Sequence, residues 1–172
     1  MKKRFLTSLC VMSLALLICL TLFVGCDKND NENDHPGGHT NKAFGVTVNG
    51  KSFSLGDSVS VLVDLAGEPQ SISEAGSCGD QGTLKKYTYS SMSVLILEND
   101  KGSTIDYISL SNDLVATDKG IRIGSSRSDV ISAYGEPETD NGSNIQYTSD
   151  EFAIKFGIAN DKVNAITLIR TT

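Results

Sequence analysis

The amino-acid sequence predicts an α+β fold of two tandem repeats. In each repeat, one helix and a short strand pack on a small antiparallel sheet of three to four strands. Two observations predict this: an internal duplication within residues 43–172, and the same order of local patterns in both copies. A repeated unit limits the architecture before any residue propensity is considered.

The duplication is clearest where two segments align without a gap at an offset of 68 residues, 53–69 (FSLGDSVSVLVDLAGEP) and 121–137 (IRIGSSRSDVISAYGEP). Further along, the offset becomes 58, because the first copy has ten extra residues after its Gly-Glu-Pro. We therefore place repeat 1 at residues 44–116 and repeat 2 at residues 117–172. Since units this small are marginal alone, we expect them to share a core or a continuous sheet.

Each copy contains a helix with recognisable ends. In the second copy, Ser126 and Asp129 have the spacing of a capping box at a helix start. Gly67 and Gly135 follow the last apolar position, and a proline two residues later prevents continuation. Asn49 and the glycine after it predict a hairpin turn before the first helix.

Three strand-like runs follow each helix. In the run 152–156, Phe152, Ile154 and Phe156 alternate with Ala153 and Lys155, which is the period of a sheet with one buried face. The other runs are 86–90, 93–97 and 105–110 in the first copy, and 144–148 and 163–169 in the second.

The N-terminal residues predict export. Three basic residues precede an apolar stretch at residues 5–24, as in a signal peptide. Phe23-Val24-Gly25-Cys26 resembles the lipobox of bacterial lipoproteins, and this resemblance implies removal of residues 1–25 and lipidation of Cys26. A retained membrane-spanning segment is the alternative. Residues 26–43 would then be the lipidated cysteine and a disordered polar linker, since residues 27–42 contain no large apolar side chain.

Composition argues against catalysis. The two histidines, His35 and His39, both lie in the linker, and Cys78 is the cysteine left when Cys26 is blocked and the leader is removed. We therefore predict no catalytic residue, no metal site and no cofactor. The net charge is -6, and without the leader 12 basic residues face 21 acidic ones, so nucleic acid is an improbable partner.

Three tyrosines are the candidate partner-binding residues. Tyr87 and Tyr89 lie two apart on one predicted strand and so share a face, and Tyr147 is the second copy's equivalent of Tyr89. On the open side of the sheet their rings would anchor a partner, and packing beneath the helix is the alternative. Val61 and Leu65 lie off the main apolar stripe of the first helix, which predicts a seam between the copies, with an external patch as the alternative.

The segment Gly124–Pro137, Gly-x-Ser-x-x-Asp-Val-Ile-x-x-Tyr-Gly-Glu-Pro, resembles the repeat of small bacterial cell-surface lipoproteins. Their fold is that of the β-lactamase inhibitory protein and of the BamE-like (SmpA/OmlA-type) envelope lipoproteins. The inhibitory protein grips an enzyme with the concave sheet of its two repeats, and the BamE-like proteins help an outer-membrane assembly machine. The resemblance therefore implies protein binding.

Together these features predict a lipid-anchored protein-binding module without catalytic activity. We expect it on the extracytoplasmic face of a membrane, at the cell surface or on the periplasmic side, with another extracytoplasmic protein as its partner. The alternatives are a structural or assembly component of a cell-envelope complex, and a small-ligand sensor that binds between the repeats.

Overall fold

The computed structural model describes residues 44–77 and 82–171, which belong to one unit of the chain, His39–Thr172. The predictions for the leader, for Cys26 and its linker, and for Cys78 therefore lie outside the described residues. Among the residues that are described, no helix is long and apolar enough to cross a membrane.

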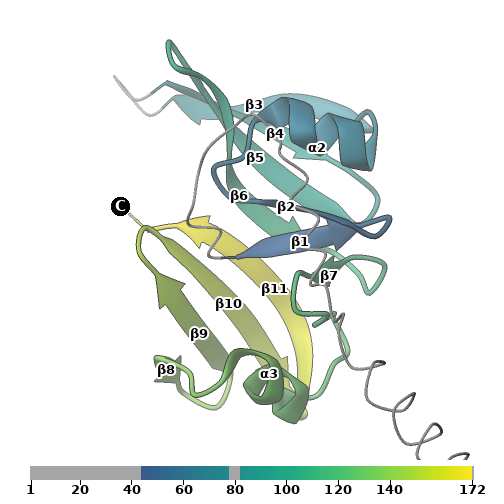
Figure 1. The fold of residues 1–172 in the computed structure, drawn as a ribbon, viewed down its shortest axis with the longest axis vertical. Coiled ribbons are helices and arrows are strands. Elements are labelled where there is room, and N and C mark those ends of the chain that lie inside the picture. The colour runs from purple at the N-terminus through teal and green to yellow at the C-terminus, as the bar shows by residue number, and fades with distance from the viewer. Residues whose placement is uncertain (1–43, 78–81, 172) are drawn as a thin grey trace, which may run out of the picture. The chain divides into compact units, whose positions relative to one another are not determined.

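The predicted fold class, α+β with two helix-on-small-sheet repeats, is wrong. Strand makes up 54% of the structure and helix 13%. The described residues form one eight-stranded antiparallel sheet in place of a small sheet of three to four strands in each repeat, with the strand order β3-β4-β5-β6-β11-β10-β9-β8 (Figure 1). Its strands are β3 (Ser71–Ser77), β4 (Thr83–Thr88), β5 (Met92–Asn99), β6 (Gly102–Leu110), β8 (Thr139–Asp140), β9 (Asn144–Ser149), β10 (Phe152–Ala159) and β11 (Lys162–Arg170).

The pairing of β6 with β11 makes this one sheet. Ile108 lies opposite Leu168, and Leu110 lies opposite Ile166. An edge strand leaves a row of backbone N–H and C=O groups unpaired, and pairing β6 with β11 satisfies both rows while burying these apolar side chains. The outer strands β3 and β8 also lay outside the predicted runs, because one contains a single large apolar residue, Ile72, and the other has two residues.

A second layer covers one face of the large sheet. It consists of α2 (Val59–Ala66), a small sheet of order β2-β1-β7, and α3 (Arg127–Tyr134). In Figure 1 the two helices lie in front of the upper and lower parts of the large sheet, with β1 and β2 between them. The strands of the small sheet are β1 (Gly45–Val48), β2 (Lys51–Ser54) and β7 (Ala116–Thr117).

The core lies between these two layers. Val94, Ile108, Leu168 and Ile154 are successive cross-strand partners on β5, β6, β11 and β10, and each is fully buried. The covering layer contributes other fully buried side chains, among them Leu62, Val130, Val46 and Phe53. One continuous core therefore underlies both helices.

The local predictions for the helix and hairpin ends are confirmed. Gly67 (φ 78°) and Gly135 (φ 85°) follow the two helices, and each N–H donates to a carbonyl of the last turn. The capping box of α3 is present, since the Ser126 hydroxyl accepts from the Asp129 N–H and the Ser126 N–H donates to the Asp129 carboxylate. Asn49 and the glycine after it join β1 to β2, both with positive φ.

Candidate functional site

Two of the three candidate tyrosines hold helix ends. The Tyr89 hydroxyl donates to the Gly67 carbonyl at 3.2 Å, and the Tyr147 hydroxyl donates to the Gly135 carbonyl at 2.9 Å. Burial is the largest effect that raises the pKa of Tyr89 to about 12, and it also raises the pKa of Tyr147. Each tyrosine therefore links the C-terminal end of one helix to the large sheet.

Tyr87 faces the same side of the sheet. It lies opposite Val94 and packs against the core, and Tyr147 lies opposite the buried Ile154. Because cross-strand partners share a face, all three rings are on the side that the helices cover. Of the two placements that the sequence left open, the structure shows packing beneath the helices.

Val61 and Leu65 lie at the junction between α2 and the small sheet. Both are partly buried against the core, and α2 lies beside β2. The Asn49 amide donates to the Leu65 carbonyl at 3.5 Å, which joins the β1–β2 turn to the helix. These contacts all lie within the first copy, so they do not show the predicted seam between the copies, and the partial burial of both side chains against the core also argues against an external patch.

The uncovered face of the large sheet carries an unexpected group of apolar side chains. Tyr107 lies opposite Leu95 on one side and Ile169 on the other, so the three form a row across β5, β6 and β11. Leu84 lies opposite Leu97 on β4 and β5. We call these five residues the open-face patch.

The open-face patch is separate from the core. Its five side chains are partly exposed, and none is among the partly buried hydrophobic residues that pack against the core. Both described helices and the small sheet contribute to the core on the other side. The patch therefore faces away from every described element of the covering layer.

One signal in the sequence could have revealed this patch. A strand with one buried and one solvated face alternates apolar with polar residues. In β5, however, residues 94–97 read Val-Leu-Ile-Leu, and the structure buries Val94 and Ile96 while Leu95 and Leu97 point to the opposite face. The unbroken apolar run indicates that both faces of this strand have apolar surroundings or a partner.

The described residues contain no cluster of three or more His, Cys, Asp or Glu side chains that could hold a metal ion. Comparison of the chain with family models, with curated proteins and with solved structures finds no match.

Proposed function

We propose that this chain is a lipid-anchored, non-catalytic module that binds another extracytoplasmic protein through the open-face patch. The observation that carries the proposal is the row Leu95–Tyr107–Ile169 on the uncovered side of the sheet. Apolar side chains that neither join the core nor lie under another element are typical of interaction surfaces. The large aromatic ring of Tyr107, at the centre of the row, is the kind of residue that contributes most to binding energy.

The dimensions of the sheet fit a protein partner. Neighbouring strands lie about 4.8 Å apart, so eight strands span roughly 34 Å. With strands of up to nine residues, this face is comparable to the roughly 800 Å² that each partner contributes to a stable protein interface. A rigid sheet also keeps the ordering cost of binding low.

The lipid anchor is supported by the residues before the described part. The Phe23–Cys26 segment has the pattern of a lipobox, and residues 27–42 are polar. A polar segment of that composition between a lipidated Cys26 and the domain would separate the domain from the lipid head groups. For this part of the proposal, Cys26→Ser should move the protein from the detergent phase to the aqueous phase in a phase-partition assay. Retention in the detergent phase would favour a spanning segment.

The docking face is tested by cross-linking in the native membrane. We place a photo-reactive phenylalanine analogue at Tyr107 in one variant and at Tyr87, on the covered side, in another. The Tyr107 probe should form a specific adduct with another protein, and the Tyr87 probe should not. Ile169→Ser should reduce the adduct, because it removes one end of the apolar row.

Leu114→Ser is the matched control for Ile169→Ser. Leu114 is 71% exposed and lies outside the sheet, so this change removes an exposed leucine without touching the open-face patch. The adduct should persist in this variant. A Tyr107 probe that captures nothing, or an adduct of equal yield from Tyr87, would rule out docking through the open face.

A further inference from the structure

We infer that the partner docked on the open face presents an acidic surface around an apolar centre, an inference that rests on the proposed function. Charged strand residues on this face are all basic. Lys86 lies opposite Leu95, at one end of the row that contains Tyr107 and Ile169. Lys155 lies opposite Thr167 on the neighbouring β11, and Lys162 begins that strand.

The two inner lysines flank the open-face patch. Lys86 is on β4 and Lys155 is on β10, four strands away in the sheet order, or roughly 19 Å at the usual strand spacing. Both side chains are exposed, and neither takes part in an ion pair among the described residues. They are therefore free to pair with carboxylates of a partner.

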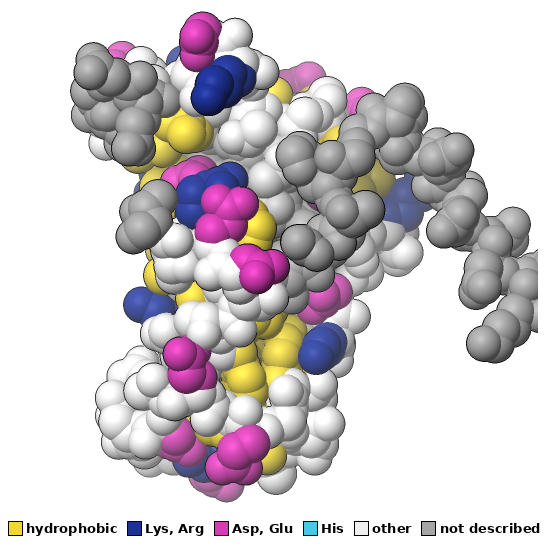
Figure 2. All heavy atoms as spheres, turned by 60° about the vertical axis from the view of Figure 1, so that its left-hand side comes forward, with side chains coloured by type: hydrophobic (Ala, Val, Ile, Leu, Met, Phe, Trp, Pro, Cys, Tyr) yellow, Lys and Arg dark blue, Asp and Glu magenta, His cyan; other side chains and the backbone are white. Residues whose placement is uncertain are grey.

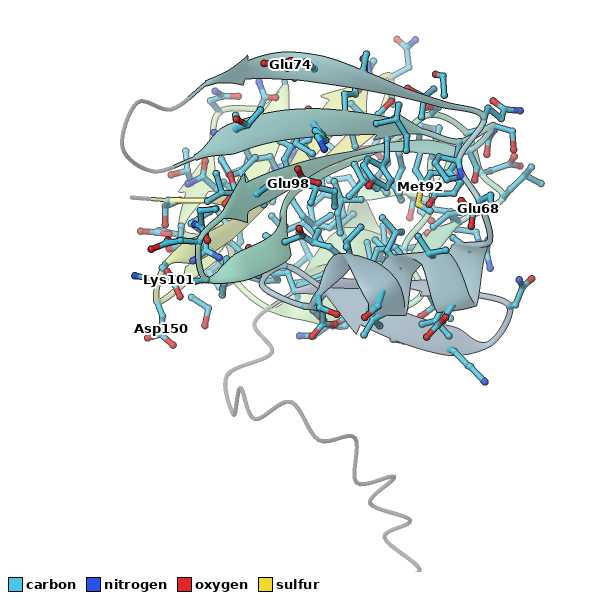
Figure 3. All side chains as sticks on the ribbon, turned by 90° about the horizontal axis from the view of Figure 1, so that it is seen from above. Glu68, Glu74, Met92, Glu98, Lys101 and Asp150 are labelled. Atoms are coloured by element: carbon cyan, nitrogen blue, oxygen red, sulfur yellow. The ribbon has the colours of Figure 1, made fainter. Side chains whose placement is uncertain are left out.

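Acidic residues of the same sheet point the other way. Glu74 on β3 and Glu98 on β5 are labelled in Figure 3, and by strand alternation both face the side that the helices cover. Glu98 pairs there with Lys85 at 2.6 Å. Asp140 on β8 lies opposite the buried Ile145 and pairs with Arg127.

Asp106, at the bulge in β6, completes the separation of charge. Its carboxylate accepts from the Arg170 guanidinium at 2.9 Å, on the covered side of the sheet. No strand residue that faces the open side, within the described part, is an aspartate or glutamate.

The basic character of the open-face strands differs from the charge of the whole chain, which is negative. The chain has a net charge of -6, and on the side shown in Figure 2 acidic and basic side chains are interspersed around hydrophobic ones. The strands of the open face, which carry lysines and no acidic residue, are thus a local exception, and the one acidic group bonded to this face in the described part is Glu138, just before β8, which accepts from the Thr148 hydroxyl. Opposite charge on a partner would steer the encounter and set its orientation, while the apolar row supplies the buried contact.

An acidic protein fits this face better than an anionic membrane. Binding to anionic lipid typically uses clusters of four to eight basic residues, whereas the open face has three lysines spread over the sheet. The negative charge of the chain would also repel an anionic bilayer. Apolar side chains flanked by lysines instead complement a protein surface with carboxylates around an apolar centre.

The experiment reverses charge at the two inner lysines. In the full chain that carries the Tyr107 cross-linker, we compare Lys86→Glu/Lys155→Glu with Lys51→Glu/Lys101→Glu. The control lysines are exposed, lie outside the open face and change the net charge equally. We expect the adduct yield to fall about tenfold in the first double variant and to stay near that of the parent in the second. Added salt should weaken the parent's adduct.

The outcomes separate this inference from the proposed function. Loss of the adduct on reversal of Lys86 and Lys155, with the cross-linked peptide in an Asp/Glu-rich region of the partner, supports it. An adduct of unchanged yield in Lys86→Glu/Lys155→Glu would leave docking through the open face intact and would overturn the inference that the partner's surface is acidic. No adduct from the parent overturns both. Sedimentation of the full chain with phosphatidylglycerol vesicles, dependent on the same two lysines, would assign the face to a membrane and overturn the inference.

Discussion

Tyr89 shows how one side chain can join a helix to a sheet. Its ring packs against the core from the residue after β4, and its hydroxyl donates to the Gly67 carbonyl just beyond α2. Tyr147 makes the corresponding contact with Gly135 beyond α3. A helix leaves its last carbonyls without partners within the helix, so a tyrosine hydroxyl that reaches this end satisfies one more acceptor.

Ionisation of Tyr89 should make the stability fall at high pH. Its pKa is raised from 10.0 to about 12 in the folded protein, first by burial and then by the Glu68 carboxylate. Because the folded state holds this proton more tightly, the contribution to stability is complete below pH 10 and is lost as the pH rises towards 12. Urea unfolding across this range should show the loss.

Tyr89→Phe is the control for that titration. Removing the hydroxyl should cost about 1 kcal/mol at neutral pH, from the lost hydrogen bond. It should also flatten the decline in the free energy of unfolding above pH 10. An unchanged slope in the variant would assign the decline to other groups.

The two helices differ at their first turns. In α3 the Ser126 hydroxyl accepts from the Asp129 N–H, and the Asp129 carboxylate accepts in return, which lowers the pKa of Asp129. In α2 the corresponding Ser58 makes no side-chain cap, and Val61 at N3 has no carboxylate that could accept from the Ser58 N–H as Asp129 does in α3. In both helices the hydroxyl of this serine also bonds the hydroxyl two residues further on, that of Ser60 in α2 and of Ser128 in α3.

This difference provides a matched pair of substitutions. Ser126→Ala should lower the free energy of unfolding by about 1 kcal/mol, as expected for loss of an N-cap. Ser58→Ala should cost clearly less, since no backbone N–H loses its partner. Denaturant titration of the two variants gives the comparison, and equal losses would contradict the role of the capping box.

At the scale of the whole molecule, the β6–β11 junction joins the two halves of the described part. Ile108 and Leu168 meet there and are fully buried. Arg170, at the end of β11, bonds Asp106 on β6 and lies 4.9 Å from the centroid of the Phe152 ring. The shared core and these cross-junction contacts predict that the two halves unfold together.

Leu168→Ala tests this cooperativity. The substitution leaves a cavity at the centre of the sheet and should cost about 2–5 kcal/mol. Unfolding followed by far-ultraviolet circular dichroism and by tyrosine fluorescence should remain a single transition, with coincident midpoints for both probes. Two separate transitions, one of them unchanged, would show that the halves are independent.

Local features could be predicted because their causes are local. The Asn49 turn, the Ser126 capping box and the glycines after both helices each depend on a few neighbouring residues. Alternating apolar residues likewise predicted the cores of the inner strands. Strand β3 was not predicted, because it is held in the sheet by its pairing with β4 and its own composition does not indicate a strand.

The candidate site could be predicted far less well. The sequence predicted that Tyr87 and Tyr89 share a face and that Tyr147 is the equivalent of Tyr89, but alternation alone does not say which face a helix covers. The open-face patch is formed by residues from β4, β5, β6 and β11, which become neighbours only through pairing. Its lysines are likewise brought to one face by registers that no single segment of the sequence encodes.

The sequence by itself determined the ends of the helices, the hairpin turn and the positions of the inner strands, because turn and capping preferences act over a few residues. Only the tertiary structure decided that β6 pairs with β11 and that no described helix or strand covers one face of the resulting sheet. The physical reason is that backbone hydrogen bonds between strands are the same for every residue type. Which edges meet is therefore set by the packing of the whole core.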